Sequence, residues 1–200
     1  MKKINTVLVF CALFLSSCQT EPLNRDNISA QNNQDETQEN SEAQECETLF
    51  AIGDDSNSKC FLEDGFNRWG WTIGPLVSGD YSFDLYSGAG QCDITKGELV
   101  GTLTVNYNEL ESVAEVQFEM TEGFILNETH LYIGNNPYPT DDDGNSTVAP
   151  GQFPDQHELD AANMDSYSVG DLSGPIYVIA HGVVCDDNDD DDDNGGGGSF

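Results

Sequence analysis

The sequence predicts an all-β fold: a single antiparallel β-sandwich domain over residues 46–185, with one long irregular loop segment. Three observations predict it. Apolar and polar residues alternate with a period of two in several segments, turn-forming residues separate these segments, and both Trp and all seven Tyr lie inside this range. Such a pattern is typical of antiparallel sandwiches and barrels. About 140 residues are also the usual size of one domain.

The clearest expected strand is the segment 111–120, in which Ala114, Val116 and Phe118 share one face and mostly acidic residues occupy the other. It is expected to form a hairpin with residues 98–107, because only a short turn separates the two. A further strand at 176–184 is apolar on both faces, which favours a central position in the sheet. The other expected strands are 47–52, 66–73, 81–87 and 124–134.

The long irregular segment spans residues 134–172 and carries few strand signals. It contains several Pro and an acidic run, and HELDAANM at 157–164 is the one stretch that favours a short helix. Loops of this length are uncommon in compact domains and are often functional. We therefore expect a site, if the domain has one, to lie here.

The N-terminus has the order of a bacterial export signal, predicted over residues 1–17. Two Lys precede a run of about a dozen apolar residues, too short to span a bilayer. Leu15-Ser16-Ser17-Cys18 is similar to a lipobox, so we expect Cys18 to carry acyl chains that anchor the chain to the outer membrane, exposed at the cell surface. A plain signal peptide with an incidental Cys is the alternative.

The predicted domain lies between two polar segments. Residues 18–45 are expected to form a disordered tether and residues 186–200 a disordered poly-Asp and Gly tail. The whole chain has a net charge of -31, and within 46–185 we count 23 acidic residues against three basic ones, a net of 3 − 23 = −20. This charge would repel a phosphate backbone, which excludes nucleic acid as a partner and favours cations.

Four Cys fall inside the predicted domain: Cys46, Cys60, Cys92 and Cys185. An even number in an exported chain indicates two disulfides, for which three pairings exist. We favour Cys46–Cys185, which would join the two domain edges, with Cys60–Cys92 inside. A zinc site is the alternative, although the chain has no C-x-x-C pair in this range.

Two sets of residues are candidate metal ligands. His130, His157 and His181 would suit a transition metal such as Zn²⁺ or Cu²⁺, although their spacing matches no local metal signature. The acidic run offers oxygen ligands for Ca²⁺, but it does not fit an EF-hand frame. For each set the structural alternative is a polar network or a solvated loop. The candidate Ca²⁺ ligands are Asp141, Asp142, Asp143 and Asn145.

Trp69 and Trp71 are two residues apart, so on a strand they would share a face. Exposed, the pair would stack on sugar rings; buried, it would belong to the core. No catalytic residue can be assigned. G-x-S-x-G is absent from the sequence, and the many carboxylates make any choice of an acid/base pair arbitrary.

Several segments of the sequence resemble motifs of a family of secreted or surface-anchored β domains found in marine Bacteroidetes and other environmental microbes. The resemblance implies no particular activity. These segments are NETHLYIG (127–134), APGQFPDQHEL (149–159), IYVIAHGVVC (176–185), RWGWTIGPL and YSFDLYSGAGQCD. The resemblance covers most of 46–185 and implies an extracellular domain.

The leading hypothesis from the sequence is a lipid-anchored β-sandwich at the cell surface with a binding or adhesion role. Its ligand would be a glycan, a protein partner or a divalent cation. The alternatives are a metal-dependent extracellular enzyme that uses the three His, and a structural envelope lipoprotein without a small ligand.

Overall fold

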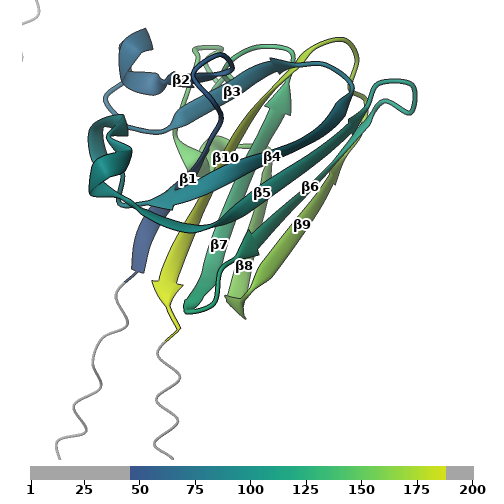
Figure 1. Ribbon diagram of the computed structural model, residues 1–200. Coiled ribbons are helices and arrows are strands. Elements are labelled where there is room, and N and C mark those ends of the chain that lie inside the picture. Colours follow the sequence, from purple (N-terminus) through teal and green to yellow (C-terminus); the bar gives the residue numbers. More distant parts are fainter. Residues whose placement is uncertain (1–45, 188–200) are drawn as a thin grey trace, which may run out of the picture. The chain divides into compact units, whose positions relative to one another are not determined.

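Strand β10 (Ile176–Asp186) lies at the centre of the fold (Figure 1). The computed structural model describes residues 46–187, so the predicted signal peptide, Cys18, the tether and nearly all of the acidic tail lie outside the described residues. One edge of β10 pairs with β7 from Tyr177 to Asp186, and the other edge pairs with β1 and, further along, with β3. The predicted central position of this segment is confirmed.

The ten described strands form one antiparallel sheet, which confirms the predicted all-β class. Starting from an edge, the order is β2-β3-β10-β1-β4-β5-β6-β9. In this order β3 and β1 pair with the same edge of β10, one after the other along its length, and β7 pairs with the opposite edge of β10 and with β8. The strands are β1 (Cys46–Ile52), β2 (Ser58–Cys60), β3 (Trp71–Leu76), β4 (Gly79–Ser87), β5 (Glu98–Asn108), β6 (Val113–Met120), β7 (Phe124–Gly134), β8 (Asp155–Ala162), β9 (Met164–Val169) and β10. The short 3-10 helices are η1 (Phe61–Asp64), η2 (Gly90–Cys92), η3 (Ile94–Lys96) and η4 (Pro150–Gln152).

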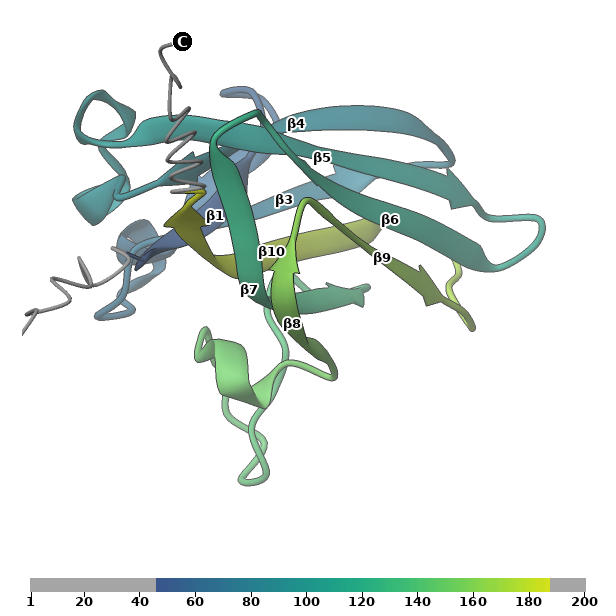
Figure 2. The same cartoon turned by 90° about the horizontal axis from the view of Figure 1, so that it is seen from below.

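The sheet curls so that its β4-β5-β6-β9 part lies over β3, β10 and β7 (Figure 2). Apolar side chains from both parts meet in the main core, because the alternation of each strand sends every second residue to the same side. The predicted hairpin between β5 and β6 is confirmed, with Val105 opposite Val116 in the ladder. Representative members of the main core are Leu85, Leu103, Phe118, Leu131 and Val178.

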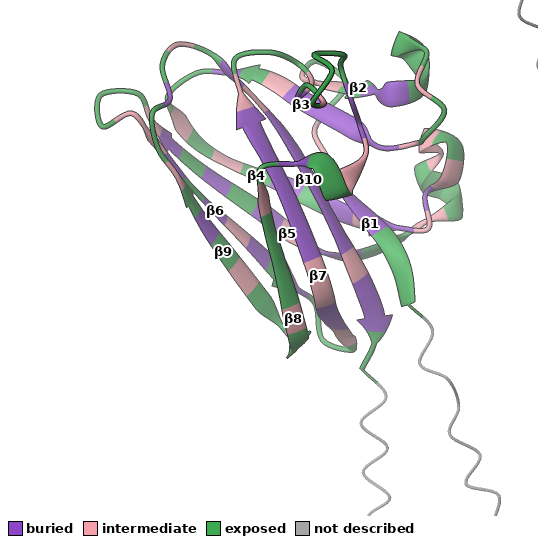
Figure 3. Cartoon of the chain, turned by 180° about the vertical axis from the view of Figure 1, so that it is seen from behind, coloured by how far each residue is buried: buried purple, intermediate pink, exposed green. Residues whose placement is uncertain are grey.

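A second, smaller core covers the opposite face of β1, β7 and β10. Phe50, Tyr132 and Ile179 project from these strands and pack against Phe61 and Phe153 from the segments that cross over them. β10 and much of β7 are therefore buried on both faces, as the colouring in Figure 3 shows. This second core positions the candidate site described below.

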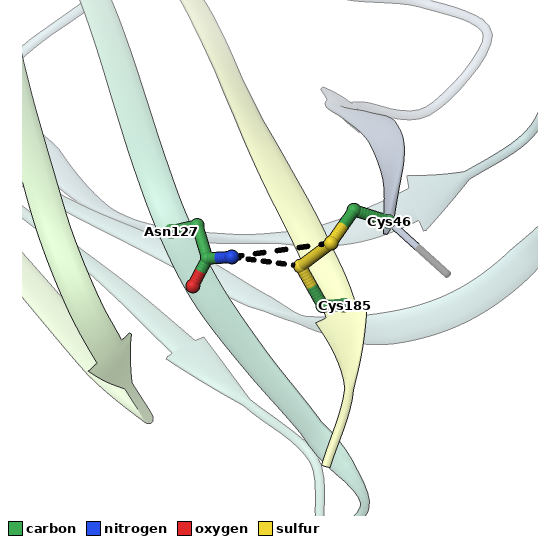
Figure 4. Close-up of a disulfide and its surroundings, with 3 residues drawn as sticks. All are labelled: Cys46, Asn127 and Cys185. Atoms are coloured by element: carbon green, nitrogen blue, oxygen red, sulfur yellow. Dashed lines mark hydrogen bonds between the residues drawn. A yellow bond between two sulfur atoms is a disulfide. The ribbon is translucent and has the colours of Figure 1, made fainter. Parts of the chain in front are cut away.

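Both predicted disulfides are confirmed, which rules out the cysteine zinc site. Cys46 pairs directly with Cys185 across β1 and β10, and Cys60 is bonded to Cys92. The side-chain amide of Asn127 on β7 points at the first bridge and donates to the Cys185 sulfur at 2.9 Å (Figure 4). The first bridge closes a loop with a sequence separation of 139, for which the chain-entropy model gives roughly 5 kcal/mol.

Two sequence predictions about the segment 134–172 are wrong. The short helix expected at 157–164 is instead most of β8 followed by the start of β9, and the irregular segment ends at residue 154. Local helix preference is weak, and here pairing of β8 with β7 and of β9 with β6 overrides it.

Candidate functional site

The structure brings two of the three His together and separates the third. His130 on β7 lies directly opposite His181 on β10, and their ring centroids are 5.1 Å apart. His157 on β8 pairs with Thr129, the neighbour of His130, so its side chain lies on the other face of the sheet. The three histidines therefore do not converge as expected for a shared metal site, and only His130 and His181 lie together.

The His130–His181 pair is buried in the second core. His130 is 4% exposed and His181 is 7% exposed. Nε2 of His130 forms a hydrogen bond with the Glu128 carboxylate on the same strand face, whereas the Nδ1 atoms of both rings are buried without a hydrogen-bond partner. Burial, helped by the nearby charges of His130 and Arg68, lowers the pKa of His181 to about 3, so this ring is neutral at ordinary pH.

A cavity of about 250 Å³ opens over His181. Its walls come from β1, from β10, from residues 67–69 and from Pro150 in η4. Two larger hollows, of about 830 and 550 Å³, have exposed carboxylates such as Glu47, Glu98 and Asp54 in their walls. The smaller cavity differs from these two in having a buried histidine in its wall. It is lined by Thr48, Phe50, Asn67, Arg68, Trp69, Pro150 and His181.

Trp69 is held at this cavity by aromatic contacts. Its ring is half-buried and meets Phe50 edge-on at 5.2 Å and Trp71 at 5.9 Å between centroids. Trp71 itself begins β3 and is only 4% exposed in the second core. The two Trp are thus not an exposed pair: Trp71 is a core residue, and Trp69 alone reaches the cavity.

Arg68 stands out electrostatically at the same place. Within residues 46–187 there are three Lys or Arg side chains, and two of them, Lys59 and Lys96, have a carboxylate partner, in Asp64 and Asp93 respectively. Arg68 is exposed and forms no ion pair in this part of the chain, yet its charge reaches His181. The cavity therefore has an unpaired guanidinium at its wall in an otherwise strongly acidic domain.

His157 belongs to a separate polar network between β8 and β9. Its Nδ1 lies 2.9 Å from the Asp165 carboxylate, which also accepts from the Thr129 hydroxyl, and its ring stacks on Tyr167 with 4.3 Å between centroids. Burial and the neighbouring carboxylates raise the pKa of Tyr167 to about 12 against the opposing effect of Thr129. This polar network links β7, β8 and β9, which is the structural alternative that the sequence analysis gave for its histidines.

The acidic loop closes on itself. The Asp141 carboxylate accepts from the backbone N–H of Asp143 at 3.0 Å and of Asn145 at 2.8 Å, while Thr140 and Ser146 form a bridge across the turn. Over residues 46–187, no group of three or more His, Cys, Asp or Glu is arranged to hold a metal ion. Calcium binding by Asp141, Asp142, Asp143 and Asn145 stays a prediction.

Comparison of the chain with protein families, with curated proteins and with solved structures found no match. Within the described range, no helix has the length and apolar character needed to cross a membrane. The assignment of function therefore depends on the geometry of the site.

Proposed function

We propose that this chain is a lipid-anchored binding protein of the bacterial cell surface whose β domain binds a short, neutral glycan in the His181 cavity. The observation that carries the proposal is the half-buried Trp69 ring beside Arg68 and Asn67 at the mouth of this cavity. An aromatic ring offers an apolar face to the C–H face of a sugar, and guanidinium and amide groups supply directional hydrogen bonds.

The size and charge of the domain narrow the ligand class. The volume of about 250 Å³ lies just below the usual range for sites that hold drug-sized ligands, so it favours one or two sugar units. The domain net charge of −20 opposes the approach of a polyanionic glycan, and Arg68 offsets only one of these charges. A neutral oligosaccharide fits both properties better than an acidic one.

Attachment to a membrane is supported by the sequence around Cys18 and by the arrangement of the domain ends. Cys46 and Cys185 are joined by a disulfide, so both ends of the domain leave from the same side (Figure 1). A chain anchored through residues 18–45 would then be held at one end of its domain. Metabolic labelling with a palmitate analogue should tag the wild type, and equal labelling of Cys18→Ser would exclude lipidation at this residue.

Glycan binding is tested by screening the detergent-purified full chain, in the presence of EDTA, against neutral and acidic oligosaccharides, followed by calorimetry on the hits. Trp69→Ala should weaken binding at least about tenfold, because the loss of a well-packed aromatic contact costs more than about 1.4 kcal/mol. Leu110→Ala, at a residue that is 98% exposed, is the matched control.

Arg68→Gln provides a second variant, because Trp69 also packs on Phe50 and its removal disturbs the second core. Arg68 makes no ion pair within residues 46–187, so the fold should be unchanged while hydrogen bonding to the ligand is reduced. The proposal is wrong if no glycan binds, or if Trp69→Ala and Arg68→Gln bind the hit as tightly as Leu110→Ala does.

A further inference from the structure

The His130–His181 pair has two buried ring nitrogens without a hydrogen-bond partner, one on each ring. Four buried side-chain N or O atoms lack a hydrogen-bond partner in residues 46–187, and two of them are the Nδ1 atoms of these rings. A buried polar group without a hydrogen-bond partner destabilises the folded state. No hydrogen bond joins the two rings, so neither nitrogen satisfies the other.

We propose that His130 and His181 bind a transition-metal ion of the Zn²⁺ or Cu²⁺ class through their Nδ1 atoms, with Glu128 as the outer partner that orients His130. This site does not depend on the proposed glycan binding. It uses two protein nitrogens as ligands. It also differs from the three-His site expected from the sequence, because His157 is on the opposite face and takes no part.

The tautomer of His130 fits a metal ligand. An ionised carboxylate only accepts hydrogen bonds, so the Nε2–H of His130 donates to Glu128. In the neutral ring this leaves the lone pair on Nδ1, the atom that has no partner. A histidine that gives one ring N–H to a carboxylate and presents the other nitrogen to a metal is the usual arrangement in metal sites.

The separation of the rings fits a shared ion. With a metal–nitrogen distance of about 2.1 Å, each ring centroid lies roughly 3.2 Å from the metal, and two such rings at a tetrahedral angle have centroids about 5.2 Å apart. The observed separation is 5.1 Å, with the ring planes tilted by 56°. The separation of the ring centroids is therefore the one expected for two imidazoles on one ion.

The surroundings favour a borderline transition metal over a hard cation. Two neutral imidazole nitrogens suit Zn²⁺ and Cu²⁺, whereas Ca²⁺ and Mg²⁺ require oxygen ligands. Arg68 opposes a cation here, but the Glu128 carboxylate and the net charge of the domain attract one. His181 also lines the cavity, so one ring of the pair lies at the cavity wall.

The test must distinguish metal binding by this histidine pair from metal binding by the many carboxylates of the domain. We propose nitrogen-15 NMR of the histidine rings in the full chain, labelled at His and titrated with Zn²⁺ without any glycan. The Nδ1 signals of His130 and His181 should shift together at one equivalent, while those of His157 stay unchanged. A shift at His157 alone, or at no histidine, would overturn the proposal.

Affinity measurements against a competing chelator supply the matched variants. His181→Phe, which keeps a ring against Phe50, should remove the tightest Zn²⁺ site, and Glu128→Gln should weaken it about 10- to 100-fold through loss of the outer carboxylate. His157→Gln, on the other face, is the control and should bind Zn²⁺ like the wild type. Identical isotherms for His181→Phe and His157→Gln would refute the site. Glycan binding is measured in EDTA, so a failure of either proposal is seen independently of the other.

Discussion

Acidification should destabilise the domain through His181, and substitution of this residue by Phe should remove the effect. The folded state keeps the ring neutral, because burial lowers its pKa from the ordinary value of 6.5 to about 3. Below the unfolded pKa the unfolded chain therefore binds a proton that the folded chain does not bind. The contribution of His181 to stability is complete above about pH 6.5 and is lost as the pH falls toward the folded pKa.

The magnitude follows from these two pKa values. On going from about pH 7.5 to about pH 5, a group with a pKa of 6.5 unfolded and about 3 folded lowers the free energy of unfolding by roughly 2 kcal/mol. Screening by solvent takes little from this figure, because His181 is only 7% exposed. The groups that face it are His130 and Glu128 from β7 and Arg68 from the crossing segment, and all three remain in the His181→Phe variant.

Urea denaturation of the full chain at the two pH values, in EDTA, measures the effect. The wild type should lose about 2 kcal/mol more than His181→Phe, and this difference cancels the titration of the acidic residues that both proteins share. His157→Gln serves as the matched control, because its ring is half-exposed on the other face, and it should keep the steeper pH dependence of the wild type. If the wild type and His181→Phe lose the same stability, His181 is not held neutral in the folded state and the reasoning fails.

Three further predictions concern the packing around the site and between the strands. Gly70→Ala should destabilise the domain by about 3 kcal/mol, because at φ +138° its Cβ would lie 2.5 Å from the Phe61 ring, and an unchanged melting temperature would contradict this packing. Replacing Cys60 and Cys92 together by Ser should cost roughly 4 kcal/mol in urea unfolding, as the chain-entropy model gives for a sequence separation of 32; a change below about 1 kcal/mol would count against the model here. Asp165→Ala should cost about 1–3 kcal/mol, because Thr129 loses its carboxylate partner, whereas a neutral result in the same assay would show that the network has no stabilising role.

The strands and disulfides were predictable because their signals are local or nearly so. Alternation with a period of two in 111–120 fixes a strand whatever it pairs with, and the apolar run at 176–184 identified the centre of the sheet. The cysteine pairing followed from a simple expectation, that a bridge between Cys46 and Cys185 joins the two edges of the domain.

The errors arose where tertiary pairing decides the structure. HELDAANM has residues compatible with a helix, and nothing in its local pattern indicates that β7 offers a free edge for β8 and that β6 offers one for β9. Likewise, the pair Trp69 and Trp71 reads as one face of a strand, but β3 begins only at Trp71 and the chain turns at Gly70. In both cases the partner that fixes the conformation lies far away in the sequence.

Which two of the three histidines lie together depends on the register of β7 with β10 and with β8. The spacing of the histidines in the sequence does not reveal this register. Residues directly opposite in an antiparallel ladder share a face, and neighbours along a strand alternate. His181 is opposite His130, so both rings enter the second core, whereas His157 is opposite Thr129 and its ring enters the gap beside Asp165. A slip of one residue between β7 and β8 would put all three rings on one face. The ladder of β7 and β8 is irregular between Leu126 and Glu128, immediately before these pairs, so the register at Thr129 and His130 is set at this irregularity. The same two strands therefore determine which histidines can share an ion and which one is left to the polar network.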